Sequence, residues 1–135
     1  MYIKQLSVFV ENKFGRVAAI VDALGKNNID ISALSLADAS EFGILRLIVD
    51  KPEEAKTLLR EQGVIVKVTD VLGVKIEDRP GGLSDILSVL KEEGVTIEYM
   101  YAFVGKNTDG ASVVFKTNND EKAYEAFKMH GIRVI

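Results

Sequence analysis

The chain contains no cysteine and only one histidine, His130, among its 135 residues. The absence of cysteine excludes disulfides, thiolate metal sites and a cysteine nucleophile. A single histidine cannot form a histidine metal cluster, and neither a phosphate-loop pattern nor a dinucleotide glycine fingerprint occurs. We therefore expect no metal, no cofactor and no catalytic residue, and we predict that the protein is not an enzyme.

An excess of positive charge and a long apolar run are also missing. Seventeen Lys and Arg stand against twenty Asp and Glu, for a formal net charge of -3, so we expect neither nucleic acid nor an anionic membrane as a partner. No run approaches the roughly eighteen apolar residues of a membrane span, and the N-terminus enters an alternating pattern without a leader. We expect a cytoplasmic protein whose 47% hydrophobic residues fill a packed core.

One unit of sequence occurs twice. Gly15 recurs as Gly81, 66 positions later, and the same spacing relates apolar and acidic positions on both sides of these glycines. The further pairs are Val8 with Val74, Glu11 with Glu77, Ile20 with Ile86, Leu24 with Leu90 and Ile31 with Ile97. The register holds without a gap through Val49, after which the second copy has two extra residues. An internal repeat of this kind indicates two copies of one structural unit.

Each copy predicts the same series of elements. In the first copy, Leu6, Val8 and Val10 alternate with mostly polar neighbours as in a half-buried strand, and the apolar residues from Val17 to Leu24 recur at helical spacing. Two strands, a charged helix and a short β-branched strand follow in each copy. The predicted ranges are Ile29–Leu36, Ile44–Val49, Glu53–Gln62 and Val64–Val68, and in the second copy Val95–Val104, Ala111–Thr117, Asp120–His130 and Ile132–Ile135.

This order predicts an α+β protein of two ferredoxin-like βαββαβ units. Each unit is expected to have a four-stranded antiparallel sheet with two helices on one face. We place the first unit at residues 1–68 and the second at residues 69–135. Because the segment from Val64 to Ile76 has almost no turn residues except Asp70 and Gly73, the linker is short. We therefore expect the two units to pack together.

The junction between the first strand and the first helix is repeated as ENKFGRV and EDRPGGL. A helix N-terminus offers unpaired N–H groups and about half a positive charge, so it can hold a carboxylate or phosphate. Gly15 and Gly81 would let such a ligand approach the backbone. Asn12 and Asp78 stand just before the turn, and an Asp beside a carboxylate-binding helix end suits a zwitterion such as a free amino acid.

The same residues are also typical of ordinary structure. Asn or Asp near a helix start commonly caps the helix, and Pro-Gly commonly forms a turn. The loop sequence by itself leaves a structural role and a binding role open.

The run Glu77-Asp78-Arg79-Pro80-Gly81-Gly82-Leu83 between strand and helix, followed by Gly94-Val95-Thr96-Ile97 at the next strand, resembles the ACT domain. This domain is the small-molecule regulatory module of amino-acid metabolism. Both halves resemble it and together cover nearly the whole chain, as in stand-alone tandem ACT proteins. The resemblance implies a non-catalytic sensor that binds free amino acids at the interface between ACT-like units and regulates amino-acid metabolism as a homodimer.

In that family, amino acids commonly bind where two ACT units meet, at the loop before the first helix and at the start of the second strand. The resemblance implies these ligand-binding residues: Asn12, Phe14, Gly15, Arg16, Val17, Asp30, Asp78, Pro80, Gly81, Gly82, Leu83 and Thr96. Phe14 replaces the usual proline in the first copy, where its bulk is expected to narrow a pocket or form its wall.

A second interpretation stays open. The chain could be an interaction or regulatory subunit of an amino-acid biosynthetic enzyme, similar to the acetolactate synthase regulatory subunit, with no ligand of its own. Such subunits usually combine one ACT unit with a different C-terminal domain, whereas this chain has two copies of the unit. In both interpretations an enzyme of amino-acid metabolism is a possible partner.

Overall fold

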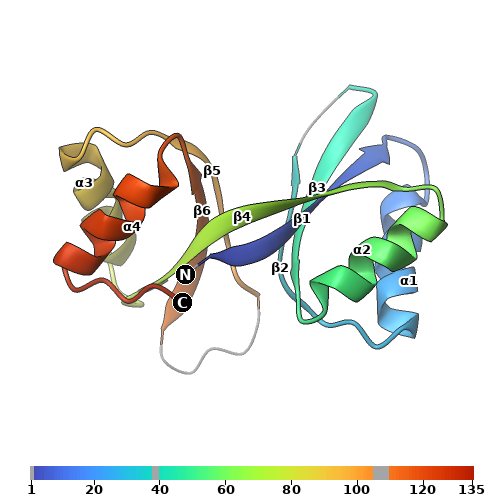
Figure 1. The fold of residues 1–135 in the computed structure, drawn as a ribbon, viewed down its shortest axis with the longest axis horizontal. Helices are drawn as coiled ribbons and strands as arrows, with labels where there is room; N and C mark the ends of the chain where they lie inside the picture. The colour runs from blue at the N-terminus through green and yellow to red at the C-terminus, as the bar shows by residue number, and fades with distance from the viewer. Residues whose placement is uncertain (1, 38–39, 105–109) are drawn as a thin grey trace. The chain divides into compact units, whose positions relative to one another are not determined.

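The computed structural model describes residues 2–37, 40–104 and 110–135 of the chain. The fold is α+β, with four helices and a six-stranded antiparallel sheet in the order β2-β3-β1-β4-β6-β5 (Figure 1). The elements are β1 Ile3–Glu11, α1 Arg16–Lys26, β2 Ile31–Ala37, β3 Phe42–Val49, α2 Pro52–Glu61, β4 Ile65–Ile76, α3 Gly82–Glu92, β5 Ile97–Ala102, β6 Ala111–Thr117 and α4 Asp120–Met129. No helix within the described ranges has the length and apolar character that crossing a membrane requires.

The chain forms two compact units. The N-terminal unit is Lys4–Asp70, and the C-terminal unit is Val71–Ile135 with the first residues of the chain through Ile3. Helices α1 and α3 are each eleven residues long and start 66 positions apart, as the internal repeat predicts. The repeat is therefore present in the structure as well as in the sequence.

In the N-terminal unit, β1 pairs antiparallel with β3, and β3 pairs antiparallel with β2. The alternation in β1 turns Leu6 and Val8 toward the core, opposite Leu47 and Leu45 of β3. Helices α1 and α2 close this core with apolar residues that include Leu24 and Leu59, both fully buried. The opposite face of β1 and β3 carries Ser7, Phe9 and Arg46 instead.

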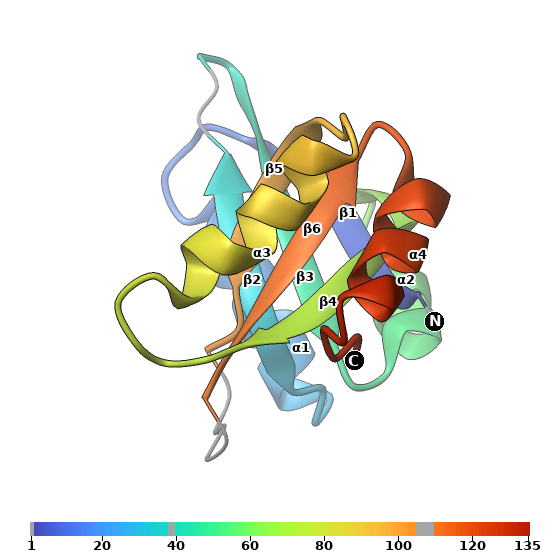
Figure 2. The same ribbon diagram turned by 90° about the vertical axis from the view of Figure 1, so that its left-hand side faces the viewer.

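In the C-terminal unit, β4 pairs with β6, and β6 pairs with β5, all antiparallel. Helices α3 and α4 cover one face of these strands (Figure 2). Phe115 of β6 and Phe127 of α4 are fully buried, with ring centroids 6.1 Å apart. An aromatic pair at this distance adds to the burial of apolar area that holds helix and sheet together.

The strands differ from the prediction at two places. The predicted strand at Val64–Val68 and the next strand through Ile76 form one continuous twelve-residue strand, β4. The predicted strand at Ile132–Ile135 is reduced to an isolated bridge between Val74 and Val134. A separate four-stranded sheet in each unit is therefore not confirmed. The physical reason is that the segment contains no turn that would divide β4.

Candidate functional site

The loop before the first helix has the same backbone geometry in both units. Gly15 and Gly81 take the N-cap positions of α1 and α3 with φ of 78° and 84°, in the left-handed region. L-residues rarely adopt this conformation, so glycine is required there by the turn itself. Neither helix has a side-chain cap at its N-terminus.

In the N-terminal unit, Asn12 joins the loop to the connection between β2 and β3. Its backbone N–H donates to Glu41 O at 2.8 Å, and its side-chain Nδ2 donates to Ser40 O at 3.4 Å. The Phe14 side chain is fully exposed and lines neither of the two cavities of this unit that are described below. Asn12 thus fixes the loop, while Phe14 projects from it.

A cavity of about 250 Å³ lies beside this loop, and we call it the loop cavity. Its lining includes Val10, Asn12, Val17, Leu36, Ala37 and Gly43. Asn12 and Val17 were predicted as site residues, whereas the three residues from β2 and β3 were not. Their involvement follows from the βαβ path, which brings the end of the second strand beside the first loop. A cavity of this kind can hold a small molecule with one polar end.

Arg16 does not line the loop cavity. It lies at the edge of a second cavity of about 270 Å³, which we call the Arg16 cavity. This cavity lies between the start of α1, the end of β1 and the segment that leads into β4. The structure therefore separates Arg16 from Asn12 and Val17.

The loop of the C-terminal unit is closed by its own side chains. The Arg79 guanidinium forms ion pairs with Glu77 and with Asp85, the latter at 2.6 Å, and donates to Pro80 O at 3.2 Å. Its two carboxylate partners, Glu77 first, raise the pKa of Arg79. Gly82 is buried, and a Cβ there would collide with Glu77 O.

The other predicted residues of this loop differ in exposure. Asp78, Pro80 and Gly81 are exposed, and half-buried Leu83 packs against the core of the unit. Asp78 and Gly81 are accessible to a ligand, whereas Gly82 and Leu83 hold the start of α3 in place.

Asp30 and Thr96, the predicted residues before the second strand, have equivalent bonds in the two units. The Asp30 amide donates to Asp50 Oδ1, and the Thr96 amide donates to Asn118 Oδ1, both at 2.9 Å. In return, the backbone amides of Asp50 and Asn118 donate to the carbonyls of Asp30 and Thr96. These reciprocal bonds fix the start of β2 and the segment before β5.

Within one unit, Asp30 lies far from the loop. Glu11 pairs with Phe42, and Ile31 pairs with Val49 at the other end of β3. Seven residue steps along β3 separate these ends by roughly 23 Å. A free amino acid cannot span this distance, so a ligand that contacts both segments needs a second unit.

Among the residues that the structure describes, no group of three or more His, Asp or Glu side chains is placed to hold a metal ion. In the described residues, the site features are two glycine-capped loops, the cavities beside them, and backbone groups at the opposite end of the strands of each unit.

This geometry defines a protein of two ferredoxin-like units with matching loops. A family model described as "ACT domain pair" matches residues 1–135. The chain belongs to the ACT domain pair family. A search of curated proteins found no match.

Solved structures with the same fold were also found. Protein BT0572 from Bacteroides thetaiotaomicron is 41% identical, with a TM-score of 0.93 and coverage of 100% of this chain and 92% of that chain. The ligand-free regulatory subunit of aspartate kinase from Thermus thermophilus is 15% identical, with a TM-score of 0.64 and coverage of 95% and 91%. The corresponding subunit from Thermus flavus is 14% identical, with a TM-score of 0.63 and coverage of 93% and 90%. The two Thermus proteins share the fold.

Proposed function

We propose that this protein is a non-catalytic sensor that binds free amino acids and thereby regulates amino-acid metabolism. The observation that carries the proposal is the loop cavity beside the glycine-capped loop, whose lining combines polar Asn12 and Glu11 with apolar residues that include Val17 and Leu36. Membership of the ACT domain pair family supports a regulatory role. The regulatory names of the two aspartate kinase subunits agree with that role.

The proposed ligand binds where two units meet. The α-carboxylate of the amino acid faces the N–H groups at the start of a helix, because the helix end is positive. The predicted residues at the start of the second strand, Asp30 and Thr96, are supplied by a different unit from the one that supplies the loop. This division of roles follows from the roughly 23 Å between the two segments of one unit.

Assembly is part of this proposal. The second unit is either the other half of the chain or a second copy, and we propose a homodimer. A ligand held by two units favours the arrangement that closes around it, so binding shifts the population of assemblies. The signal is then read by an enzyme of amino-acid metabolism that contacts the protein.

A thermal-shift screen against the twenty amino acids at millimolar concentration tests the proposal. A ligand at about a hundred times its Kd stabilises the folded state by roughly 2.7 kcal/mol, which moves the Tm by several degrees. We expect one amino acid or one chemically related group to raise the Tm.

Silence across the screen would contradict the sensor and favour the alternative subunit role. In that role the protein would co-purify with a large catalytic chain and show no response to free amino acids. A pull-down from cells of the source species, followed by mass spectrometry, separates the two functions.

A further inference from the structure

The Arg16 cavity has a composition that the proposed amino-acid site does not explain. Its inner wall is apolar, formed by Val10, Ile20 and Val64. Val10 and Ile20 are buried, so this wall is part of the fixed core of the N-terminal unit. The volume of about 270 Å³ suits one small organic molecule.

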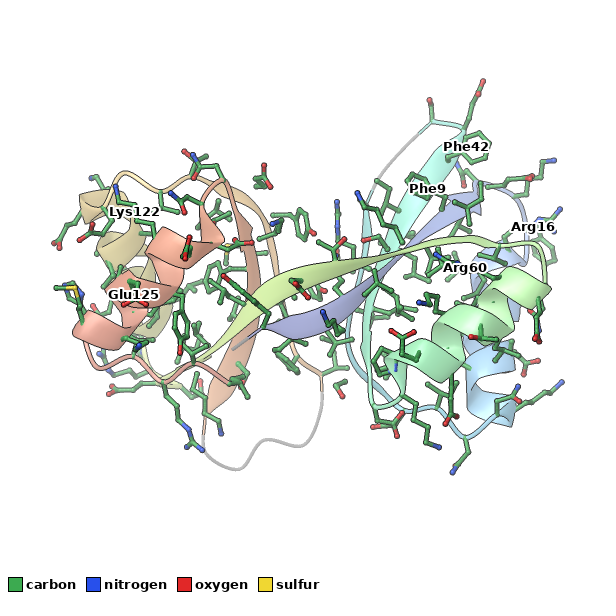
Figure 3. All side chains as sticks on the ribbon, in the orientation of Figure 1. Phe9, Arg16, Phe42, Arg60, Lys122 and Glu125 are labelled. Atoms are coloured by element: carbon green, nitrogen blue, oxygen red, sulfur yellow. The ribbon has the colours of Figure 1, made fainter. Side chains whose placement is uncertain are left out.

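Three large apolar residues also line this cavity, and Phe9 and Phe42 lie on the face of the sheet opposite Val10. Phe9 pairs with Ile44, and Glu11 pairs with Phe42, so Phe9 and Phe42 are diagonal neighbours on one face of the sheet (Figure 3). Phe9, Phe42 and Ile65 are 43%, 52% and 68% exposed. Three such residues around one cavity form an apolar patch, and patches of this kind often mark binding sites.

The cavity also has a cation, Arg16, without an ion pair of its own in the described residues. In the described part of the chain, no acid lies within ion-pair distance of the Arg16 guanidinium, and its side chain makes no hydrogen bond. Glu11, which also lines the cavity, is paired with Lys13 at 3.0 Å. The hydrogen bond from Lys13 and, to a smaller degree, the charge of Arg16 lower the pKa of Glu11, so Glu11 stays ionised. Two cations, Lys13 and Arg16, thus share one carboxylate, and the group keeps a net positive charge.

The internal repeat supplies a comparison within the same chain. The C-terminal unit has a cavity at the equivalent position, with the same apolar wall but with charged residues in place of Phe9, Ala19 and Ile65. At the positions of Phe9, Arg16, Ala19, Gln62 and Ile65 it has Lys75, Gly82, Asp85, His130 and Arg133. Both units have the same fold, but only the N-terminal cavity has Phe9 and Arg16. These two residues are therefore a feature of the N-terminal unit and are not required by the fold.

We propose that the Arg16 cavity binds a monocarboxylate with an aromatic or branched apolar body. The carboxylate pairs with the Arg16 guanidinium, whose fork of donors matches two carboxylate oxygens, and it accepts a hydrogen bond from the side-chain amide of Gln62. The apolar body lies against Phe9 and Phe42. An amino group is not required, because Glu11 already has Lys13 as its partner.

This site goes beyond the proposed amino-acid site, and it gives Arg16 a different ligand from the one that the family resemblance implies. The two cavities adjoin at Val10 and Glu11, so occupancy of one can affect the other. The inference does not depend on whether the loop cavity binds amino acids.

Amide NMR with 3-phenylpropionate as the probe tests the proposal. We expect saturable chemical-shift changes at Gln62, Gly63 and Val64 of the full-length protein. The uncharged 3-phenylpropionamide is the matched probe, and we expect it to bind about tenfold more weakly or worse, because the charge-assisted pair with Arg16 is lost.

Three variants complete the test. Arg16→Gln is expected to weaken 3-phenylpropionate by about tenfold or more, and Phe9→Lys, which installs the residue of the C-terminal cavity, is expected to abolish the shifts. Both side chains are exposed, so neither change disturbs the core. Arg133→Gln, in the equivalent C-terminal cavity, is the matched control and is expected to leave binding unchanged.

Three results would overturn the proposal. These are the absence of shifts at millimolar probe, shifts centred on Asn12, Ala37 and Gly43 in the loop cavity, and equal affinity of Arg16→Gln and the unaltered protein. Because the probe has no amino group, failure here leaves the amino-acid screen unaffected. A silent amino-acid screen in turn leaves this test unaffected.

Discussion

Gly15 and Gly81 occupy the same left-handed backbone conformation, 66 positions apart, immediately before α1 and α3. A Cβ on Gly15 would meet no atom within 4 Å, and one on Gly81 would meet only the Arg79 side chain at 3.5 Å. Glycine is therefore required at both positions because of the left-handed backbone conformation, and not because a side chain would collide with neighbouring atoms.

Gly15→Ala is expected to lower the free energy of unfolding by roughly 1 to 2 kcal/mol, the cost of placing an L-residue in the left-handed region. The matched control is Gly25→Ala, within α1 and also with nothing within 4 Å of the added Cβ. Gly25→Ala is expected to raise the same quantity by roughly 0.5 to 1 kcal/mol, because alanine favours the helix. Urea denaturation of both variants measures the difference. Equal effects of the two changes would show that the conformation of Gly15 carries no cost.

Gly73 in β4 is required for a different reason. A Cβ there would collide with the Ile3 side chain, and both residues belong to the C-terminal unit. We expect Gly73→Ala to destabilise the protein by roughly 1 to 3 kcal/mol, as overpacking in a core does. The cost should shrink in an Ile3→Ala background, where the colliding atoms are gone, and a double-mutant cycle measures this coupling. Additive effects would contradict the contact.

The carboxylate of Asp120, at the start of α4, is expected to make the stability of the fold depend on pH. Partial burial raises its pKa, but bonds from Lys116 Nζ at 2.6 Å, from the Thr117 hydroxyl at 2.6 Å and from the Thr117 amide at 2.9 Å outweigh burial and lower it. A lowered carboxyl pKa stabilises the fold above the unfolded value of about 3.9, and this contribution is lost as the pH falls through the folded value.

The substitution Asp120→Asn tests this pH dependence, because it keeps the shape of the side chain and removes its charge. It is expected to lower the free energy of unfolding near neutral pH by about 1 to 3 kcal/mol, the range for hydrogen bonds to charged groups. It should also flatten the loss of stability at acid pH, measured by urea denaturation between about pH 2 and pH 6. An unchanged acid limb would show that other carboxylates govern acid unfolding.

The hydrophobic periodicity predicted most of the fold. The spacing of Gly15 and Gly81 placed α1 and α3 at equivalent positions, and the strand predicted at Ala111–Thr117 coincides with β6. Continuity of β4 through Asp70 was not predicted, because a polar residue in a strand looks like a turn until its partner is known. In the structure Asp70 forms an ion pair with Lys4 of β1, with 2.6 Å between Nζ and Oδ1.

The candidate site was predictable only in part. The loop pattern and the ACT resemblance predicted Asn12, Arg16 and Val17 together, but they could not show that Arg16 lines a different cavity from the other two. A signal for the second cavity was present at Phe9, an aromatic residue at a strand position where alternation predicts a polar one. The position of Phe9 can be interpreted only once Phe42 is known to be its diagonal neighbour on the adjacent strand.

Calorimetric titration of the amino acid that raises the Tm most, into the unaltered protein and into Asn12→Ala and Gly81→Val, tests the central claim most directly. The account predicts saturable binding that both changes weaken, since Asn12 anchors the loop beside its cavity and a β-branched side chain at Gly81 strains the turn and blocks approach. Affinity that neither change alters, or no saturable heat with any of the twenty amino acids, would contradict amino-acid binding at these loops.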